Sequence, residues 1–225
     1  VGAVIGFLLF GVHLFFDATG LNKWIIGEGL FLVAVATILT RGIHLDGLAD
    51  SFDGLFSMAD KARSLEIMRD SRIGTFGALG IIFVIGLKWS AYVQLIETAN
   101  LMWIVVTTII SRAAIVEQAV SLPYARREGG TGAPFIEGAR PLHKVLSRLT
   151  ALLLLIPFGP AAIVLVLVGW IFVKLTGVFF QRRVGGVTGD LLGASSELTE
   201  TLCLVILALT AHRVELFLGW HILLR

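Results

Sequence analysis

The sequence predicts an all-α protein, a bundle of about six to seven membrane-spanning helices with acidic helix or loop segments on the cytoplasmic side. Apolar residues make up 56% of the 225 residues, charged residues only 15%, and mean hydropathy is +0.90. Soluble domains average about 45–50% apolar and about 25% charged residues. The apolar segments lack the alternation of a membrane β-barrel. The length predicts a single domain, residues 1–225.

The apolar segments define the expected spans, each of which needs about 20 residues to cross a bilayer. The segment Leu149–Gln181 is long for one span and short for two. Two prolines and a glycine break it near residue 159. We therefore expect a hairpin rather than one tilted helix. The chain opens inside an apolar run, and we expect that an N-terminal segment is missing. The other expected spans are Val1–Phe16, Trp24–Leu39, Phe76–Ile96, Leu101–Val120 and Leu198–His212, with an apolar tail, Leu216–Leu224.

The few charged residues indicate orientation and exclude some functions. Net charge is only +2 and the charges lie in short blocks, which excludes a nucleic-acid-binding stripe. The single cysteine, Cys203, excludes a disulfide framework and a cysteine metal site. The connecting segments Arg41–Gly74 and Pro123–Arg148 are rich in Lys and Arg, so both are expected in the cytoplasm.

A row of aspartates lies in the first of these segments, within about 80° on a helix at 100° per residue. Like charges on one face destabilise a bare helix, so the row predicts a cation opposite it, and carboxylates suit Mg²⁺ or Mn²⁺. Gly47 and Gly54 remove bulk where a large ligand could approach. The alternative to a metal site is that these aspartates form only the solvated face of a cytoplasmic helix. For nearby His44 three roles stay open: a ligand, a base or a structural residue. The row consists of Asp46, Asp50, Asp53 and Asp60.

Basic residues are candidates for phosphate binding at two places in the connecting segments. Arg69 and Arg72, three residues apart on an expected helix, present planar donors that suit phosphate oxygens, or simply anchor the cytoplasmic side. Arg126 and Arg127 precede a glycine-rich stretch that either lets backbone amides approach a phosphate or is a flexible connection.

Two further basic residues lie inside apolar segments. Arg112 is expected within a span, where a charge is costly and usually faces a polar cavity or a partner, Glu117 being the candidate partner. Lys174 is expected at comparable depth, where it either lines the same anion pocket or extends to the interface.

A second acidic cluster, Gly185–Glu200, precedes the last expected span. Asp190 and Glu197 are seven residues apart on one helix face, with Glu200 one turn further. Such a face is expected if the reaction requires a second metal or a general base.

Four motifs together resemble the cobalamin synthase family, also called adenosylcobinamide-GDP ribazoletransferases. They are H-x-D-G-x-x-D-x-x-D-G from His44, L-E-I-M-R-D-S-R-I-G-x-x-G from Leu65, Y-A-R from Tyr124, and G-G-x-T-G-D-x-x-G-A-x-x-E from Gly185. The resemblance implies a multi-pass enzyme of the inner membrane with its active site facing the cytoplasm. It implies Mg²⁺-dependent joining of adenosylcobinamide-GDP to α-ribazole or its 5′-phosphate, with release of GMP. Homo-oligomer formation is left open.

The resemblance also implies roles for the matching residues. We expect Asp46, Asp50 and Asp53 to hold Mg²⁺ against the pyrophosphate while a ribazole hydroxyl attacks the phosphorus attached to cobinamide. Asp190 or Glu197 is the expected general base or second metal ligand. Positioning and charge neutralisation would carry most of the catalysis. The substrate- and phosphate-binding candidates are His44, Arg69, Arg72, Arg112, Arg126, Arg127 and Thr188.

Two alternatives are weaker. A CDP-alcohol phosphotransferase would share Asp50, Asp53 and Gly54, but Met58 stands where that family has Ala-Arg, and its second half is absent. A cation or metabolite transporter would line a path with intramembrane acids. Here most of the acids cluster at the cytoplasmic boundary and no inverted repeat is visible, which favours chemistry at one face.

Overall fold

The computed structural model describes residues 1–126 and 129–214, with side chains through Ala211, and confirms the all-α fold class. Some neighbouring α-helices are separated by short 3₁₀ turns, which lie at Leu21–Lys23, Leu101–Trp103 and Ile156–Phe158. The helices are α1 Gly2–Ala18, α2 Ile25–Leu39, α3 Ile43–Phe56, α4 Lys61–Ile67, α5 Thr75–Glu97, α6 Ile104–Ser121, α7 Ala133–Glu137, α8 Pro141–Leu155, α9 Pro160–Val184 and α10 Gly189–Val214.

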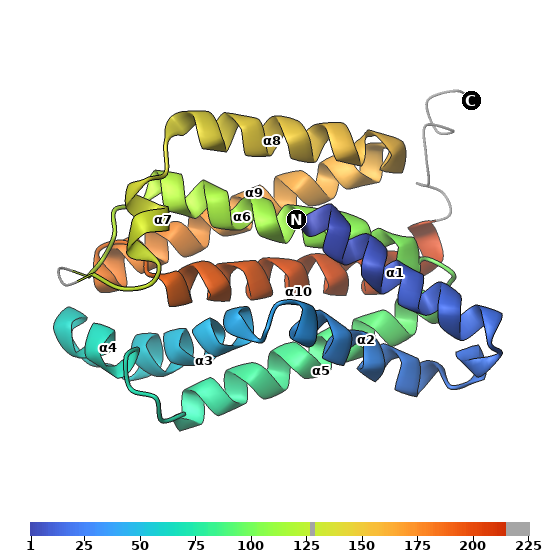
Figure 1. Cartoon of the computed structure of the whole chain (residues 1–225), viewed down its shortest axis with the longest axis horizontal. Coiled ribbons are helices and arrows are strands. Elements are labelled where there is room, and N and C mark those ends of the chain that lie inside the picture. Colours follow the sequence, from blue (N-terminus) through green and yellow to red (C-terminus); the bar gives the residue numbers. More distant parts are fainter. Residues whose placement is uncertain (127–128, 215–225) are drawn as a thin grey trace.

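The bundle is built around α10 and α6, the two most buried of the long apolar helices. In Figure 1, α10 runs along the middle, with α3 and α5 on one side and α6 and α9 on the other. The main core combines large buried side chains such as Tyr92 and Trp103 with small residues on α10. Small residues let helix backbones approach closely in a membrane, where lipid gives no hydrophobic drive for association.

Five helices in the described part of the chain are long and apolar enough to cross a membrane, and a sixth span results if α2 and α3 count together. α2 has 15 residues and is followed by a 90° bend into α3. Arg41 and Gly42 make the bend with positive φ angles of 54° and 68°, and Gly42 caps α3. The expected span Trp24–Leu39 forms α2, which does not count as a span alone and joins α3 as either a broken span or a re-entrant loop. The Val1–Phe16 segment forms the shorter apolar helix α1.

The predicted hairpin is confirmed, with different boundaries. Pro157 and Gly159 lie in the break between α8 and α9, and Pro160 begins α9. α8 begins at Pro141 rather than Leu149, because this proline takes the first helical position and the basic residues that follow are accommodated within the helix. The second helix ends with Arg182 and Arg183 in its last turn.

The expected start of the last span at Leu198 is wrong. α10 begins at Gly189, so the second acidic cluster is the first half of a long helix rather than a segment before it. Hydropathy misplaced the boundary because Glu197 and Glu200 have buried basic partners that make a membrane position tolerable. The expected apolar tail Leu216–Leu224 lies outside the described residues.

Candidate functional site

The aspartates of α3 meet the beginning of α10. Asp46 is exposed and Asp50 is half-buried, and the described residues offer neither side chain a hydrogen bond or ion pair. A Cβ at Gly47 would lie 2.8 Å from the backbone oxygen of Asp190, so the absence of a side chain allows the two helices to touch. A Cβ at Gly54 would meet Met68 and the backbone of α4. The expectation that these glycines leave room for a ligand is therefore wrong, because protein fills the space.

Asp53 accepts hydrogen bonds from the backbone at the start of α5. Its two carboxylate oxygens accept hydrogen bonds from the amides of Gly74, at 2.7 Å, and Gly77, at 2.8 Å. These amides belong to the start of α5, where no partner within the helix exists. Asp53 thus fixes the position of α5 against α3.

Asp190 faces Arg126 across the same end of the bundle. The Arg126 Nη2 donates to Asp190 Oδ2 at 2.6 Å, and the Thr188 hydroxyl donates to the same oxygen at 3.3 Å. The Thr188 oxygen also accepts from the amide of Leu191 at 3.3 Å, near the first turn of α10. Thr188 is fully buried, so the structure gives it a positioning role rather than the expected contact with substrate.

Backbone pairing brings the Y-A-R motif to the last motif. Ala125 donates to the carbonyl of Val187 at 3.0 Å, and Val187 donates to the carbonyl of Pro123 at 2.9 Å. A Cβ at Gly186 would overlap the carbonyl of Pro123, so only glycine permits this approach. Arg126 therefore follows a short backbone pairing, which explains how a loop residue is aimed at Asp190.

These contacts define the acidic site, which we name for its carboxylates. The negative charges of Asp46, Asp53 and Asp190 act on the Asp50 carboxyl group. The positive charge of Arg126 acts on it in the opposite sense. In the described part of the chain, three carboxylates without backbone partners therefore lie near one arginine. The acidic site consists of Asp46, Asp50, Asp190 and Arg126.

The described residues alone do not assemble a complete metal site. Among the described residues, no three His, Cys, Asp or Glu side chains lie close enough to hold a metal ion. Asp46 and Asp50 still offer hard oxygen donors without protein partners, and Mg²⁺ commonly uses one or two carboxylates together with substrate phosphate oxygens. The residues present fit a metal completed by substrate, with Asp53 already occupied by backbone amides.

Several predicted residues lie outside the acidic site. The row does not reach Asp60, because α3 ends at Phe56 and Asp60 caps α4 by accepting from Arg63. Arg69 and Arg72 follow the end of α4 at Ile67, so they do not share a helix face. Arg72 is exposed and bonded to Asp70, whose pKa it lowers to about 2 by hydrogen bonding. Arg127 lies outside the described residues.

Glu197 and Glu200 belong to a separate buried cluster, the central ion network, which joins α5, α6 and α10. Lys88 Nζ donates to Glu197 at 2.5 Å and to Glu200 at 2.9 Å. Arg112 Nη1 donates to Glu200 at 3.0 Å and to the Ser196 hydroxyl at 2.8 Å. Glu197 is thus placed away from the acidic site that its expected roles require. The network consists of Lys88, Arg112, Glu197 and Glu200.

Arg112 has a different partner from the one considered in the sequence. It pairs with Glu200, whereas Glu117 pairs with other residues. Arg112 also lines a cavity of about 650 Å³ together with His44, which lies beside the central ion network. Lys174 pairs with Glu117 at 2.7 Å and lines a different pocket, so Arg112 and Lys174 do not share one anion site.

Sequence reasoning missed Lys88 and Glu28. Both were counted within apolar spans, yet Lys88 is central to the buried network and Glu28 accepts a 2.6 Å contact from His13. The available signal was the charge itself, because ionisable residues inside a span are costly and usually have a partner.

Comparisons with known proteins agree with the four motifs. The cobalamin-5-phosphate synthase family matches residues 1–208. An adenosylcobinamide-GDP ribazoletransferase of Chlorobium chlorochromatii is 37% identical over 96% of this chain and 86% of its own length. Proteins of the same name from Chlorobium phaeobacteroides and Syntrophobacter fumaroxidans are each 40% identical, over 90% and 77% of this chain and 82% and 70% of their own. No solved structure matches significantly.

Proposed function

The chain belongs to the cobalamin-5-phosphate synthase family, a family of transferases, and we propose that it transfers the cobinamide phosphate of adenosylcobinamide-GDP to α-ribazole or its 5′-phosphate. GMP is the leaving group. The relatives' names supply the substrates, and the acidic site supplies a place for the chemistry.

The observation that carries this proposal is the meeting of three separate motifs at the acidic site. Asp46 and Asp50 come from α3, Arg126 from the loop after α6, and Asp190 from the first turn of α10. Carboxylates in excess of basic side chains favour an added cation, and a pyrophosphate is the ligand that such a cation and an arginine hold together.

We assign Asp46 and Asp50 as the protein ligands of Mg²⁺, because they are the carboxylates of the site without a protein partner in the described structure. Bound Mg²⁺ supplies neutralisation of the pyrophosphate charge. Arg126 donates through Nη2 to Asp190 at 2.6 Å and its Nε is buried, so Nη1 is the nitrogen left to donate to a phosphate oxygen.

The transfer exchanges one phosphorus–oxygen bond for another. The ribazole hydroxyl oxygen bonds to the phosphorus attached to cobinamide, the bond from that phosphorus to the bridging oxygen breaks, and GMP leaves with the bridging oxygen. The hydroxyl proton passes to a carboxylate of the acidic site. Of the two bases expected from sequence, Asp190 lies in this site and Glu197 is paired with Lys88 elsewhere.

We place the enzyme in the inner membrane with the acidic site on the cytoplasmic side, because the basic connecting segments lie at that end of the bundle. The lipid bilayer and the two substrates are then its partners. Nucleic acid is not, since the chain has no basic stripe.

The test is GMP release by the purified protein in lipid vesicles supplied with adenosylcobinamide-GDP, α-ribazole and Mg²⁺. We expect Asp50→Asn to reduce release by about a hundredfold or more, as removal of a charge that stabilises a transition state does. Asp60→Asn is the matched control, because asparagine caps a helix as well as aspartate.

Three outcomes would contradict the proposal. Wild-type turnover by Asp50→Asn at limiting Mg²⁺ would remove the metal assignment. Release of CMP from a CDP-alcohol, with no GMP from adenosylcobinamide-GDP, would identify the rival transferase. Release only from vesicles whose outer surface is the periplasmic one would reverse the orientation.

A further inference from the structure

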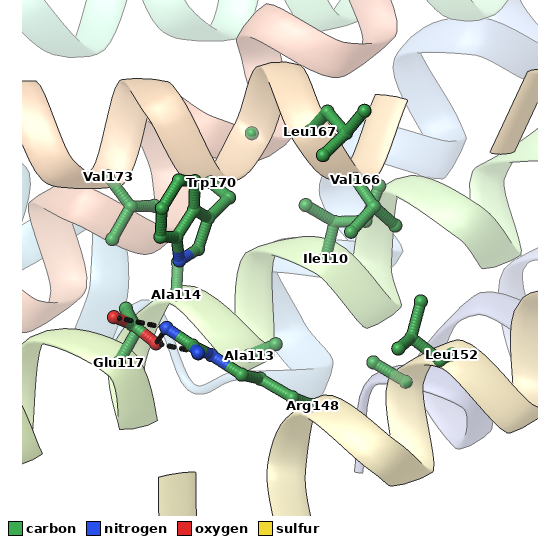
Figure 2. Close-up of a pocket in the computed structure, with 12 residues that line it drawn as sticks. Ile110, Ala113, Ala114, Glu117, Arg148, Leu152, Val166, Leu167, Trp170 and Val173 are labelled. Carbon is green, nitrogen blue, oxygen red and sulfur yellow. Dashed lines mark hydrogen bonds and ion pairs between the residues drawn. The ribbon is translucent and has the colours of Figure 1, made fainter. Parts of the chain in front are cut away.

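An apolar groove lies between α8 and α9, away from the acidic site, with α6 as its floor. Its volume is about 330 Å³. In Figure 2, Leu152 comes from α8, Trp170 and Leu167 from α9, and Ile110 from α6, with Arg148 and Glu117 at one end. Leu152, Leu167 and Trp170 are exposed on helices long and apolar enough to cross the membrane, so the groove opens toward lipid.

Three basic side chains surround one carboxylate at the charged end. Arg148 donates to both oxygens of Glu117, at 2.9 Å and 3.0 Å, and Lys144 and Lys174 approach the same carboxylate at 3.0 Å and 2.7 Å. Glu117 is buried, with 7% of its side chain exposed, whereas Arg148 and Lys174 are 45% and 40% exposed. One acid neutralises one of the three bases, so an excess of two positive charges faces outward.

The order of charged and apolar residues is the same on all three helices. Proceeding from the charged end, α6 presents Glu117 and then Ile110, and α8 presents Arg148 and then Leu152. On α9, Lys174 contacts Glu117 from the adjoining pocket, and Leu167 lines the apolar part of the groove. The charged end corresponds to the expected cytoplasmic side, where α6 ends, α8 begins and α9 ends.

An aromatic ring marks the boundary between the two parts. Trp170 lies 5.6 Å from both the Arg148 guanidinium and the Lys174 ammonium, measured from its ring centroid. The groove therefore has charge, an aromatic ring and apolar surface in the order in which a phospholipid has phosphate, glycerol and acyl chain.

We propose that this groove binds an anionic phospholipid, with the phosphate on Arg148 and Lys174 and an acyl chain along Leu152, Leu167 and Ile110. The positive excess selects an anionic over a zwitterionic headgroup, since basic pockets between cytoplasmic helix ends bind anionic lipids. The apolar part selects a lipid over a free phosphate, which could occupy only the charged end.

The test measures lipid binding by native mass spectrometry of the full chain in detergent, with phosphatidylglycerol and phosphatidylcholine as probes. We expect preferential binding of phosphatidylglycerol, weakened roughly 30-fold in Arg148→Gln/Lys174→Gln, since each basic residue near a membrane surface contributes about one factor of five. Lys144 still pairs with Glu117 in that variant, so no buried carboxylate is left alone. Lys23→Gln, an exposed basic residue outside the groove, is the control and should bind as wild type.

A second variant examines the apolar part. Leu152→Trp fills the groove without removing a charge, and we expect it to weaken phosphatidylglycerol binding while leaving the melting temperature near that of wild type. Equal binding of the two lipids, or unchanged binding by either groove variant, would overturn the proposal. Competition by inorganic phosphate at equal concentration would assign the charged end to a soluble anion. A detergent-stable dimer that excludes lipid would assign the groove to a second copy of the chain. Either result would overturn the proposal. If the double variant does not fold, Lys174→Gln alone decides, with a smaller expected loss.

Discussion

The acidic site and the central ion network differ in charge balance. Among the described residues, the acidic site has three carboxylates and one arginine, whereas the network has two carboxylates, one lysine and one arginine. α10 supplies acids to both, Asp190 at its beginning and Glu197 and Glu200 further along. An unbalanced cluster at an accessible end needs a cation from outside and therefore points to function. A balanced, buried cluster is satisfied by the protein and therefore points to structure.

The largest expected effect follows from unbalancing the network. Lys88→Met leaves two buried carboxylates with fewer partners, and breaking a buried pair costs about 3–5 kcal/mol. We expect a large loss of unfolding free energy, measured by thermal or denaturant unfolding in detergent. Lys23→Met is the exposed control and should change stability little. An unchanged melting temperature for Lys88→Met would show that the network does not hold the bundle together.

An intermediate effect is expected for Arg112, which lines the cavity beside His44 as well as joining the network. Arg112→Ala removes the charge-assisted hydrogen bond to Glu200, worth about 1.5–3 kcal/mol, so stability should fall by about 2 kcal/mol. Arg112→Lys keeps a charge toward Glu200 and should lose less than half as much. Unfolding and turnover per folded molecule are measured for both. Full stability with lost turnover in Arg112→Lys would instead make the guanidinium a substrate ligand, since an ammonium does not replace a planar fork.

The smallest expected effect concerns the acidic site in the absence of substrate. Because binding to the folded state stabilises it, Mg²⁺ at ten times its dissociation constant should raise the unfolding free energy by about 1.4 kcal/mol. Asp50→Asn should reduce this gain, and Asp60→Asn should keep it, since Asp60 caps α4. Melting temperatures with and without Mg²⁺ provide the measurement. Equal gains in both variants would mean that the cation binds elsewhere.

Sequence patterns predicted what depends on neighbouring residues. The helical spacing of Asp46 and Asp50 placed them together, and the prolines near residue 159 located the break between α8 and α9. The motifs also contain Asp190 and Arg126, but only the structure shows their contact at 2.6 Å.

Other features depend on distant partners or on backbone conformations without a sequence mark. α3 ends before Asp60 because the chain turns near Met58, which has a positive φ of 57° although it is neither glycine nor asparagine. Glu197 is separated from Lys88 by 109 residues, so no local pattern could reveal their pairing. Asp53 likewise finds its amides 21 and 24 residues away.

The pairing of Lys88 with α10 has a consequence for biosynthesis. Lys88 enters the membrane with α5, but its partner Glu197 is synthesised 109 residues later. At about 5–20 residues per second, the lysine waits roughly 5–22 s for its counter-charge. During that interval α5 carries an uncompensated cation among apolar residues, which insertion scales place at about 2.5–3.5 kcal/mol. Insertion of α10 therefore also commits α5 to its final depth, and a chain released before α10 is made would keep an incompletely settled α5.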